Sequence, residues 1–280
     1  MKPEHLITTS PQTLYAMEVE SCVPQLGVGR DHRKLLVVDG CEAFLGGFNI
    51  HRQGSWRAHG EARWRDTHVH VSGVLAAQAV ELFDTFWRGE RYMLTQRSGA
   101  SSVLLSNHTR SCRQRLECIF NAMFADARTS LSLTTPYFVP SRSMRQALQE
   151  AARRGVDVRL LVPRISDVRL ARWAAQSIYG ELLQAGVKIF EYLPRLLHAK
   201  TAVADSNWVL MGTANLDYRS VFLSYELILA SRDPGLCRSL RNQFDVDLVE
   251  SREVKWEHWH RRGWRGRLAE WLAWSLRHWL

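Results

Sequence analysis

The chain has few cysteines, and none of them are spaced as metal ligands usually are. Five cysteines occur in 280 residues, an odd number with no C-x-x-C pair, so neither a disulfide framework nor a cysteine-based zinc site is expected. His68-x-His70 and His258-x-His260 could be metal ligands, but no cysteines or clustered carboxylates accompany them. We therefore expect no metal, no cofactor and a reduced chain on the cytosolic side.

The sequence also lacks an apolar run of the length that crosses a bilayer. Residues 1–30 are polar and mixed, which predicts no signal peptide. The content of hydrophobic residues, 46%, is nevertheless ordinary for a globular protein. Any membrane contact is therefore expected to be peripheral.

Positive charge and tryptophan are both abundant. The formal net charge of +9 attracts phosphate-bearing partners, and charge alone does not separate nucleic acid from anionic lipid. Tryptophan favours the headgroup boundary of a bilayer. Six of the eleven tryptophans lie in the last 29 residues: Trp256, Trp259, Trp264, Trp271, Trp274 and Trp279. This distribution favours anionic phospholipid as the partner, with no nucleic acid expected.

The C-terminal tryptophans belong to a predicted amphipathic helix from Gly263 to Leu280. Its apolar face consists of Leu268, Trp271, Leu272, Leu276 and Trp279. The opposite face consists of Arg267, Glu270 and Arg277. Such a helix either lies in the headgroup region of an anionic bilayer or packs its apolar face against the protein.

One pattern of polar residues occurs twice in the chain, as H-x-K-x4-D-x6-G-x2-N. A constant offset of 166 residues relates the first copy, His32, Lys34, Asp39, Gly46 and Asn49, to the second, His198, Lys200, Asp205, Gly212 and Asn215. A repeat at fixed offset usually means two similar structural units. Two unrelated β-hairpins would explain the turn and the apolar residues, but not the matched His, Lys and Asn.

Strands and helices are expected to alternate in the second half of the chain, which indicates an α/β fold. The predicted strands are residues 34–38, 43–47, 67–72, 130–135, 156–162, 187–192 and 227–230, with two more in the second motif and a possible strand at 13–19. The predicted helices are residues 73–88, 116–127, 144–154 and 168–184. Residues 90–113 are expected to connect the halves.

We expect a three-part division: an N-terminal half at residues 1–97, a C-terminal half at 98–250 and a membrane-surface tail at 251–280. About 80 residues of alternating strands and helices precede the second motif, whereas 31 residues precede the first. The N-terminal half is therefore expected to be incomplete.

The two motifs fit one phosphoryl centre better than two separate ones. A phosphodiester carries negative charge on its non-bridging oxygens, and its transition state spreads more charge over them. Lys34 and Lys200, with the amides of Asn49 and Asn215, could hold those oxygens without a metal. One histidine would attack phosphorus, and the other would protonate the leaving alkoxide and later activate the acceptor.

Two carboxylates follow the motifs at similar distances. Asp66 lies 34 residues after His32, and Glu226 lies 28 residues after His198. Each precedes a predicted strand and is a candidate for orienting a histidine, although each could also be an ordinary surface acid. The motif aspartates, Asp39 and Asp205, are expected at hairpin turns.

Small residues close each motif. Gly46 and Gly47 in the first copy correspond to Gly212 and Thr213 in the second. They are expected where the backbone approaches the phosphate or the other motif closely.

The paired motifs resemble the HxK(x)4D signature of the phospholipase D superfamily. Three further stretches, residues 64–68 (WRDTH), 135–141 (TPYFVPS) and 215–220 (NLDYRS), make the chain similar to bacterial cardiolipin synthases from about Arg30 to Asp233. The resemblance implies two α/β halves with mixed sheets and a shared site, metal-free ping-pong phosphatidyl transfer, His32 as nucleophile and His198 as acid and base. By it, Asp66 and Glu226 match the orienting carboxylates.

The resemblance implies a phosphatidyltransferase acting on phosphatidylglycerol at the cytoplasmic face of the bacterial inner membrane. Two alternatives stay open. One is a phosphodiesterase of the same chemistry, either a lipid hydrolase or a nuclease. The other is a non-catalytic or partner-dependent lipid-binding fragment with an incomplete first half.

Overall fold

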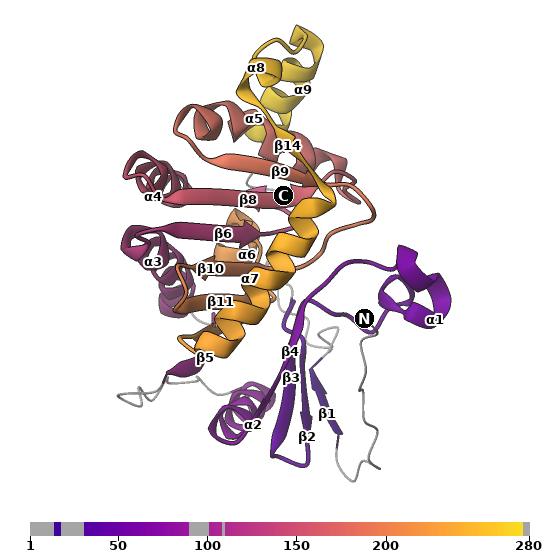
Figure 1. Cartoon of the computed structure of the whole chain (residues 1–280). Coiled ribbons are helices and arrows are strands. Elements are labelled where there is room, and N and C mark those ends of the chain that lie inside the picture. Colours follow the sequence, from indigo (N-terminus) through magenta and orange to yellow (C-terminus); the bar gives the residue numbers. More distant parts are fainter. Residues whose placement is uncertain (1–13, 18–30, 90–100, 108–109, 277–280) are drawn as a thin grey trace.

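A computed structural model describes residues 14–17, 31–89, 101–107 and 110–276 (Figure 1). Two sheets of unequal size dominate these residues, and helices cover them. The strands of the smaller sheet run in the order β1-β2-β3-β4, and those of the larger one in the order β14-β9-β8-β6-β10-β11-β13-β5. The predicted α/β class is confirmed, with a large mixed sheet flanked by helices. The prediction of a mixed sheet in the N-terminal half is wrong, because all pairs of the smaller sheet are antiparallel.

The smaller sheet belongs to the N-terminal half and is antiparallel throughout. Its strands are β1 (Leu14–Met17), β2 (Leu35–Val38), β3 (Glu42–Gly46) and β4 (His68–Ser72). A lobe of short helices separates β3 from β4: η1 (Arg52–Gly54), α1 (Trp56–His59) and η2 (Gly60–Ala62). The helix α2 (Val74–Trp87) follows β4 and packs against the sheet.

The larger sheet is mixed, because parallel strands at its centre are joined by helical crossovers. Its first elements are β5 (Ser102–Ser106), α3 (Arg110–Asp126), β6 (Ser130–Thr134), α4 (Arg142–Arg153), β8 (Asp157–Pro163), α5 (Arg169–Gln184) and β9 (Lys188–Tyr192). Strands β6, β8 and β9 are parallel. This is the alternation that the sequence predicted.

The second half of the larger sheet is antiparallel. Its elements are β10 (Thr201–Ala204), β11 (Trp208–Gly212), α6 (Tyr218–Phe222), β13 (Leu227–Ser231), α7 (Pro234–Val249) and β14 (Ser251–Val254). Two short strands, β7 (Phe138–Val139) and β12 (Leu216–Asp217), form a separate parallel pair. The chain continues into α8 (Trp256–Trp259) and α9 (Trp264–Ser275).

The segment that connects the two halves contains regular secondary structure. Residues 90–113 were predicted to be a connection. This is wrong for Ser102–Ser106, which form the edge strand β5 beside β13, and for residues 110–113, which begin α3. The three-part division at residues 97 and 250 stays a prediction. Strand β14 begins directly after the second of these boundaries and pairs with β9 in the large sheet.

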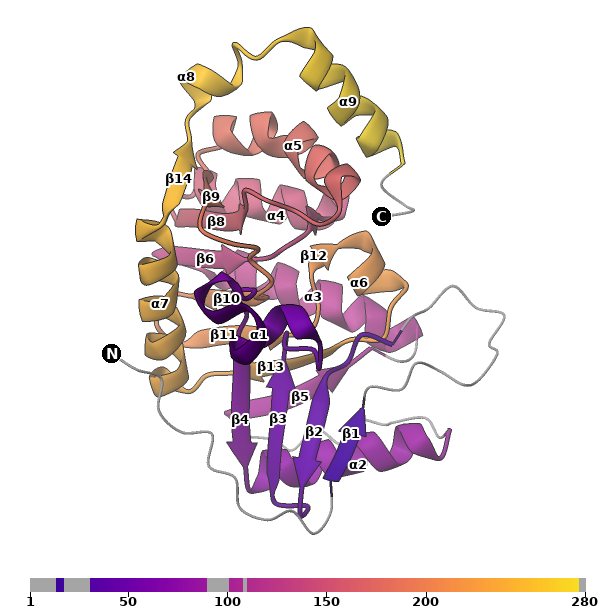
Figure 2. The ribbon, with the colours of Figure 1, turned by 90° about the vertical axis from the view of Figure 1, so that its right-hand side faces the viewer.

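Each motif forms a hairpin whose inward face packs against the equivalent face of the other hairpin. Val37 and Leu45 in the first copy, like Val203 and Met211 in the second, are buried in one hydrophobic cluster that joins both halves. On the opposite face of the large sheet, α3, α4 and α5 cover a second core. Figure 2 shows the smaller sheet packed against β11 and β13 of the larger one. Because equivalent faces pack together, the ends of the two hairpins that carry the histidines also lie close to each other.

The described part of α9 packs against α5 with only one of its faces. Ala273 is buried beside Ala174 and Val139, with Trp274 packed alongside. The predicted apolar face points elsewhere: Leu268, Trp271, Leu272 and Leu276 are between 48% and 63% exposed. Arg277 and Trp279 of the same predicted helix lie outside the described residues. In the described part of the chain, no helix is long and apolar enough to cross a membrane.

Candidate active site

Two backbone bridges join the halves beside the motif histidines. The His32 amide donates to the Tyr225 carbonyl at 2.9 Å, and the His198 amide donates to the Arg65 carbonyl at 2.7 Å. The acceptor in each case immediately precedes one of the candidate carboxylates, Glu226 or Asp66. Each bridge therefore brings a histidine of one half next to a carboxylate of the other.

The side chains follow the same crossed arrangement. The Nδ1 atom of His198 lies 2.6 Å from Oδ2 of Asp66, and the Nδ1 atom of His32 lies 3.2 Å from Oε1 of Glu226. Both carboxylates are almost fully buried, with side chains 3% and 0% exposed. Because Nδ1 faces the carboxylate in both pairs, each ring is left with Nε2 for other chemistry.

Both motif lysines are anchored on the backbone of their own histidine. Lys34 Nζ donates to the His32 carbonyl at 2.6 Å, and Lys200 Nζ donates to the His198 carbonyl at 2.5 Å. Lys200 Nζ also lies 3.1 Å from each ring nitrogen of His198. Strand pleating places residues i and i+2 on the same side, so this geometry follows from the H-x-K spacing.

Burial and neighbouring charges shift two of these groups. Burial lowers the pKa of Lys200 to about 8, with Asp66 acting to raise it and Lys34 to lower it. Burial and the nearby Lys200 ammonium lower the pKa of His198, while Asp66 acts in the opposite direction. Because Lys34 and Asp66 of the first half act on Lys200 and His198 of the second, the charged groups share one site.

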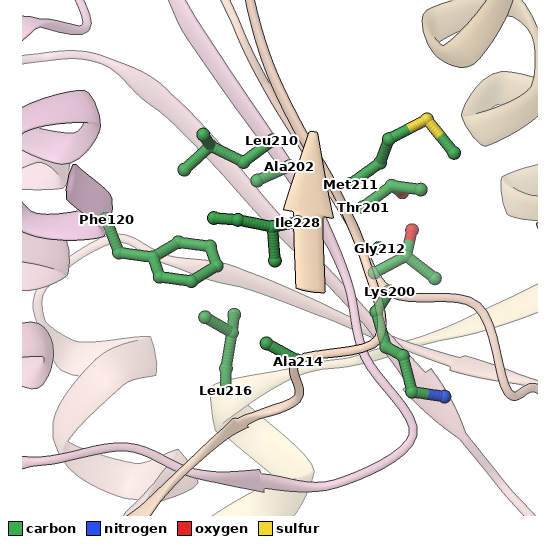
Figure 3. A pocket seen from close by; sticks show the side chains of 11 residues that line it. Phe120, Lys200, Thr201, Ala202, Leu210, Met211, Gly212, Ala214, Leu216 and Ile228 are labelled. Carbon is green, nitrogen blue, oxygen red and sulfur yellow. The ribbon is translucent and has the colours of Figure 1, made fainter. Parts of the chain in front are cut away.

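Figure 3 shows the Lys200 side chain at the edge of a cavity, with its nitrogen pointing away from the apolar side chains. Its aliphatic stem borders a narrow apolar cavity that Phe120 of α3, Leu210 of β11 and Ile228 of β13 also line. Lys200 as a whole is 6% exposed. Such an environment disfavours the charged form until an anion binds beside it.

The other predicted site residues occupy different places around this centre. Asn215 is buried, and its Oδ1 has no hydrogen-bond partner among the described residues. Asn49 follows β3 and is partly exposed. Gly46 and Gly212 adopt positive φ values of 148° and 158°. A Cβ atom at either position would lie within 3 Å of the neighbouring strand, which only glycine avoids.

The motif aspartates lie at the hairpin turns, away from the histidines. Asp39 and Asp205 both have φ of 51°, in the left-handed region that Asp tolerates in tight turns. Burial would raise the pKa of Asp205, but hydrogen bonds from the backbone amides of Thr129, Ser130 and Arg128 lower it. Asp205 thereby ties its hairpin to the start of β6.

Several supporting residues were missed by the sequence analysis. Arg65 forms a bidentate ion pair with Asp247 of α7 and also donates to the Asp66 carbonyl. Arg33 pairs with Asp31 and lies 3.9 Å above the Phe86 ring. Arg33 occupies the variable position of the first H-x-K copy, and Arg65 lies in the stretch at residues 64–68. The repeat matches neither arginine in the second copy, so it did not indicate their roles.

Two of the three stretches that resemble cardiolipin synthases also lie side by side. Strand β7 pairs in parallel with β12, so residues 135–141 run beside residues 215–220. The Leu216 amide donates to the Thr135 hydroxyl at 3.2 Å. The third stretch contributes Trp64, whose ring centroid lies 5.2 Å from that of His198. All three stretches therefore border the region of the second motif.

The first pair of histidines considered as metal ligands, His68 and His70, has other contacts. His70 is hydrogen-bonded to Glu42, and His68 stacks on Phe48 with ring centroids 5.5 Å apart. Burial lowers the pKa of His68 to about 4, with Asp66 acting to raise it. Across the described ranges, no three His, Cys, Asp or Glu side chains gather as metal ligands would.

A family model and several curated proteins that match this chain are all described as cardiolipin synthases. Residues 120–248 match the family model described as cardiolipin synthase, PLD-like domain. Over 253 residues the chain is 37% identical to cardiolipin synthase 2 of Bacillus cereus, covering 86% of this chain and 49% of that protein. It is 34% identical over 258 residues to a cardiolipin synthase of Clostridium perfringens, covering 86% and 54% respectively.

The chain spans about half the length of the curated relatives it matches. Among solved structures, it resembles the phosphatidylserine synthase of Haemophilus influenzae Rd KW20 with a TM-score of 0.65 and 13% identity. The match covers 88% of this chain and 68% of that one. At this identity the likeness shows a shared fold.

Proposed function

We propose that this chain, which carries a phospholipase D-like domain of the cardiolipin synthase type, is a phosphatidyltransferase that uses phosphatidylglycerol at a membrane surface. The observation that carries the proposal is the crossed pair of histidine–carboxylate contacts at one seam between the halves. Two oriented imidazoles beside two lysines are what a two-step transfer at phosphorus requires.

In the first step, His32 Nε2 attacks the phosphorus of phosphatidylglycerol. A P–N bond forms, the P–O bond to glycerol breaks, and the departing alkoxide takes a proton from His198. Glu226 stabilises the His32 ring through Nδ1. The lowered pKa of His198 makes its imidazolium a stronger acid, which suits protonation of an alkoxide.

In the second step, the hydroxyl of another phosphatidylglycerol replaces glycerol. It gives its proton to His198 while its oxygen forms a new P–O bond, and the P–N bond to His32 breaks. Lys34 and Lys200 offset the charge on the non-bridging oxygens in both steps, and Asn49 and Asn215 are proposed to add amide donors. No metal or cofactor takes part in this scheme.

The exposed apolar face of α9 supports lipid as the substrate. Trp271 is 63% exposed and Leu272 is 51% exposed, beside a basic C-terminal segment. A helix of this kind binds the headgroup region of anionic bilayers. We propose peripheral binding to the cytoplasmic face of the bacterial inner membrane.

Mass spectrometry of products formed from phosphatidylglycerol vesicles tests the proposal. Wild type is expected to release glycerol and form cardiolipin, whereas His32→Ala and His198→Ala should form neither. Phosphatidic acid as the sole product would indicate a hydrolase, and nicking of plasmid DNA without lipid turnover would indicate a nuclease. Vesicle binding that is unchanged in His32→Ala, with no turnover by wild type, would indicate a non-catalytic lipid-binding chain.

A further inference from the structure

A buried network of polar groups lies behind Glu226, on the side away from His32. Glu226 is 0% exposed, and a buried carboxylate is costly unless hydrogen bonds satisfy it. While Oε1 faces His32, Oε2 accepts a hydrogen bond from the Thr213 hydroxyl at 2.5 Å. The Thr213 oxygen in turn accepts from the Leu227 amide at 2.9 Å. The Leu227 carbonyl is a second acceptor for the hydroxyl proton at 3.3 Å, so the nearer Glu226 carboxylate is the favoured one.

A second group, Asn107, holds the backbone around Glu226. It follows β5 directly and is 0% exposed. Its Oδ1 accepts from the Glu226 amide at 2.5 Å, and its Nδ2 donates to the carbonyls of Ser220 and Ser224 at 3.1 and 2.9 Å. The Asn107 side chain therefore ties both ends of the 220–226 segment together.

That segment provides both contacts by which the C-terminal half holds His32. The Tyr225 carbonyl accepts from the His32 amide, and the Glu226 carboxylate meets the His32 ring. A shift of the segment would move both contacts together. We call Thr213 and Asn107 the Glu226 clamp.

Among the described residues of the first half, no hydroxyl side chain donates to the Asp66 carboxylate as Thr213 does to Glu226, and the repeat shows why. Gly47 stands at the position equivalent to Thr213, and a Cβ atom there would lie 2.0 Å from Oδ1 of Asp66. The shorter Asp66 thus needs the space that a side chain would fill, and its Oδ1 accepts from the Thr67 amide instead. Glycine suits aspartate in one half, and threonine suits glutamate in the other.

We propose that Thr213 and Asn107 are positioning residues that hold the Glu226 carboxylate against His32 Nδ1 and thereby direct His32 Nε2 toward the substrate. The part of the inference that concerns rate rests on the proposed function. The part that concerns the His32 ring does not, because the tautomer and ionisation of a histidine can be measured without turnover.

The test compares Thr213→Val, which keeps the shape of the side chain but removes the hydroxyl, with Thr213→Ser, which keeps the hydroxyl. For transfer from phosphatidylglycerol, kcat is expected to fall on the order of 10- to 100-fold in Thr213→Val with little change in KM, the effect of losing one hydrogen bond to a charged group. Thr213→Ser should recover most of this loss. Asn107→Asp, which loses both amide donors, should lower kcat in the same way.

Nitrogen NMR of histidine-labelled protein gives the readout that does not depend on activity. The His32 ring signals and their pH titration should shift in Thr213→Val and return toward wild type in Thr213→Ser. Thr85→Val, the same change at a buried threonine of α2, controls for a general loss of packing. Equal kcat values and unchanged His32 signals in the valine and serine variants would overturn the proposal. Shifted His32 signals in a protein without transferase activity would support the clamp while contradicting the proposed function.

Discussion

Asp66 and His198 are 132 residues apart in sequence, yet Asp66 Oδ2 lies 2.6 Å from His198 Nδ1. The contact joins the N-terminal half to the C-terminal half, and a hydrogen bond from the His198 amide to the Arg65 carbonyl supports it. Each motif histidine therefore meets its carboxylate across the interface, with His198 beside Asp66 and His32 beside Glu226. Catalysis of the proposed kind depends on the interface between the halves as much as on the motifs.

Asp66→Asn should abolish most of the activity with little loss of structure. An amide cannot stabilise the imidazolium that forms at His198, so kcat for transfer is expected to fall on the order of 10²–10⁴-fold. Steady-state kinetics on phosphatidylglycerol vesicles measures the effect. Glu81→Gln, on the exposed side of α2, is the control and should retain wild-type activity. Wild-type kcat in Asp66→Asn would exclude a role for this carboxylate in the reaction.

The rate should fall at alkaline pH because of Lys200. Burial lowers the pKa of Lys200 to about 8, so the ammonium that attracts the phosphodiester is lost above that pH in the free enzyme. We expect kcat/KM to decrease above pH about 8. A bound phosphodiester favours the ammonium, so the corresponding limb in kcat should lie at higher pH. In Lys200→Arg, whose guanidinium stays charged, the alkaline fall of kcat/KM should disappear from the measurable pH range. If the fall occurs at the same pH in the variant, a group other than Lys200 causes it.

Asp217 should make folding stability depend on pH. Burial raises its pKa from 3.8 to about 6, while hydrogen bonds from Ser220 and Asn215 act to lower it. Since the folded pKa is the higher one, the contribution of Asp217 to stability is fully present below pH 3.8 and is lost as pH rises through about 6.

Asp217→Asn keeps an acceptor for the Ser220 amide at the start of α6 and removes this dependence. As pH rises from about 4 to 7, wild type loses the contribution of Asp217 and the variant does not. The unfolding free energy of the variant minus that of wild type should therefore grow by at most about 3 kcal/mol, at ~1.4 kcal/mol per pKa unit. Urea denaturation at several pH values measures the difference. Asp233→Asn changes the exposed N-cap of α7 and is the control. A difference in unfolding free energy between Asp217→Asn and wild type that does not change with pH would contradict the prediction.

Glu226 and Thr213 should be replaceable by their counterparts from the first half, aspartate and glycine, only when both are changed together. Glu226→Asp alone places a shorter carboxylate beside Thr213 and should lower kcat on the order of 10-fold or more. Adding Thr213→Gly reproduces the arrangement of Gly47 and Asp66 and should restore part of the loss. A double-mutant cycle measures the coupling. Independent, additive losses would show that the two positions do not act together.

Membrane binding should depend on the exposed face of α9. Replacing Trp271 and Leu272 by serine is expected to weaken binding to phosphatidylglycerol vesicles about tenfold or more, because burying one large apolar side chain contributes ~1.5–3 kcal/mol. Co-sedimentation measures the affinity. Trp87→Ser on α2 is a matched control, since Trp87 is 67% exposed and Trp271 is 63% exposed. Equal effects at both sites, or no effect at either, would argue against α9 as the membrane contact.

The hairpins and the residues that each motif carries were predictable from the sequence. Apolar alternation predicted β2, β3, β10 and β11, because side chains alternate across a strand whatever the strand packs against. The spacing of His32 and Lys34, repeated at His198 and Lys200, also determined that each lysine lies on the side of its own histidine. These relationships are local, so they follow from the chain alone.

Strand β5 was not predictable, because it exists by pairing with β13 more than 120 residues away. The same pairing buries Asn107 and gives it a role that no motif indicates. For α9, the sequence indicated an amphipathic helix but left open whether its apolar face packs against the protein. The contact with α5 decided this, since the stripe that includes Ala273 packs there and Trp271 stays exposed.

The sequence by itself determined that the chain carries two equivalent sets of histidine, lysine and asparagine, together with candidate carboxylates. Which carboxylate serves which histidine was decided by tertiary structure alone. Equivalent sheet faces pack against each other through Val37, Leu45, Val203 and Met211. Strand β4, which follows the first motif, therefore begins beside the second motif, and β13 begins beside the first. The histidines therefore pair across the interface, with Asp66 at His198 and Glu226 at His32.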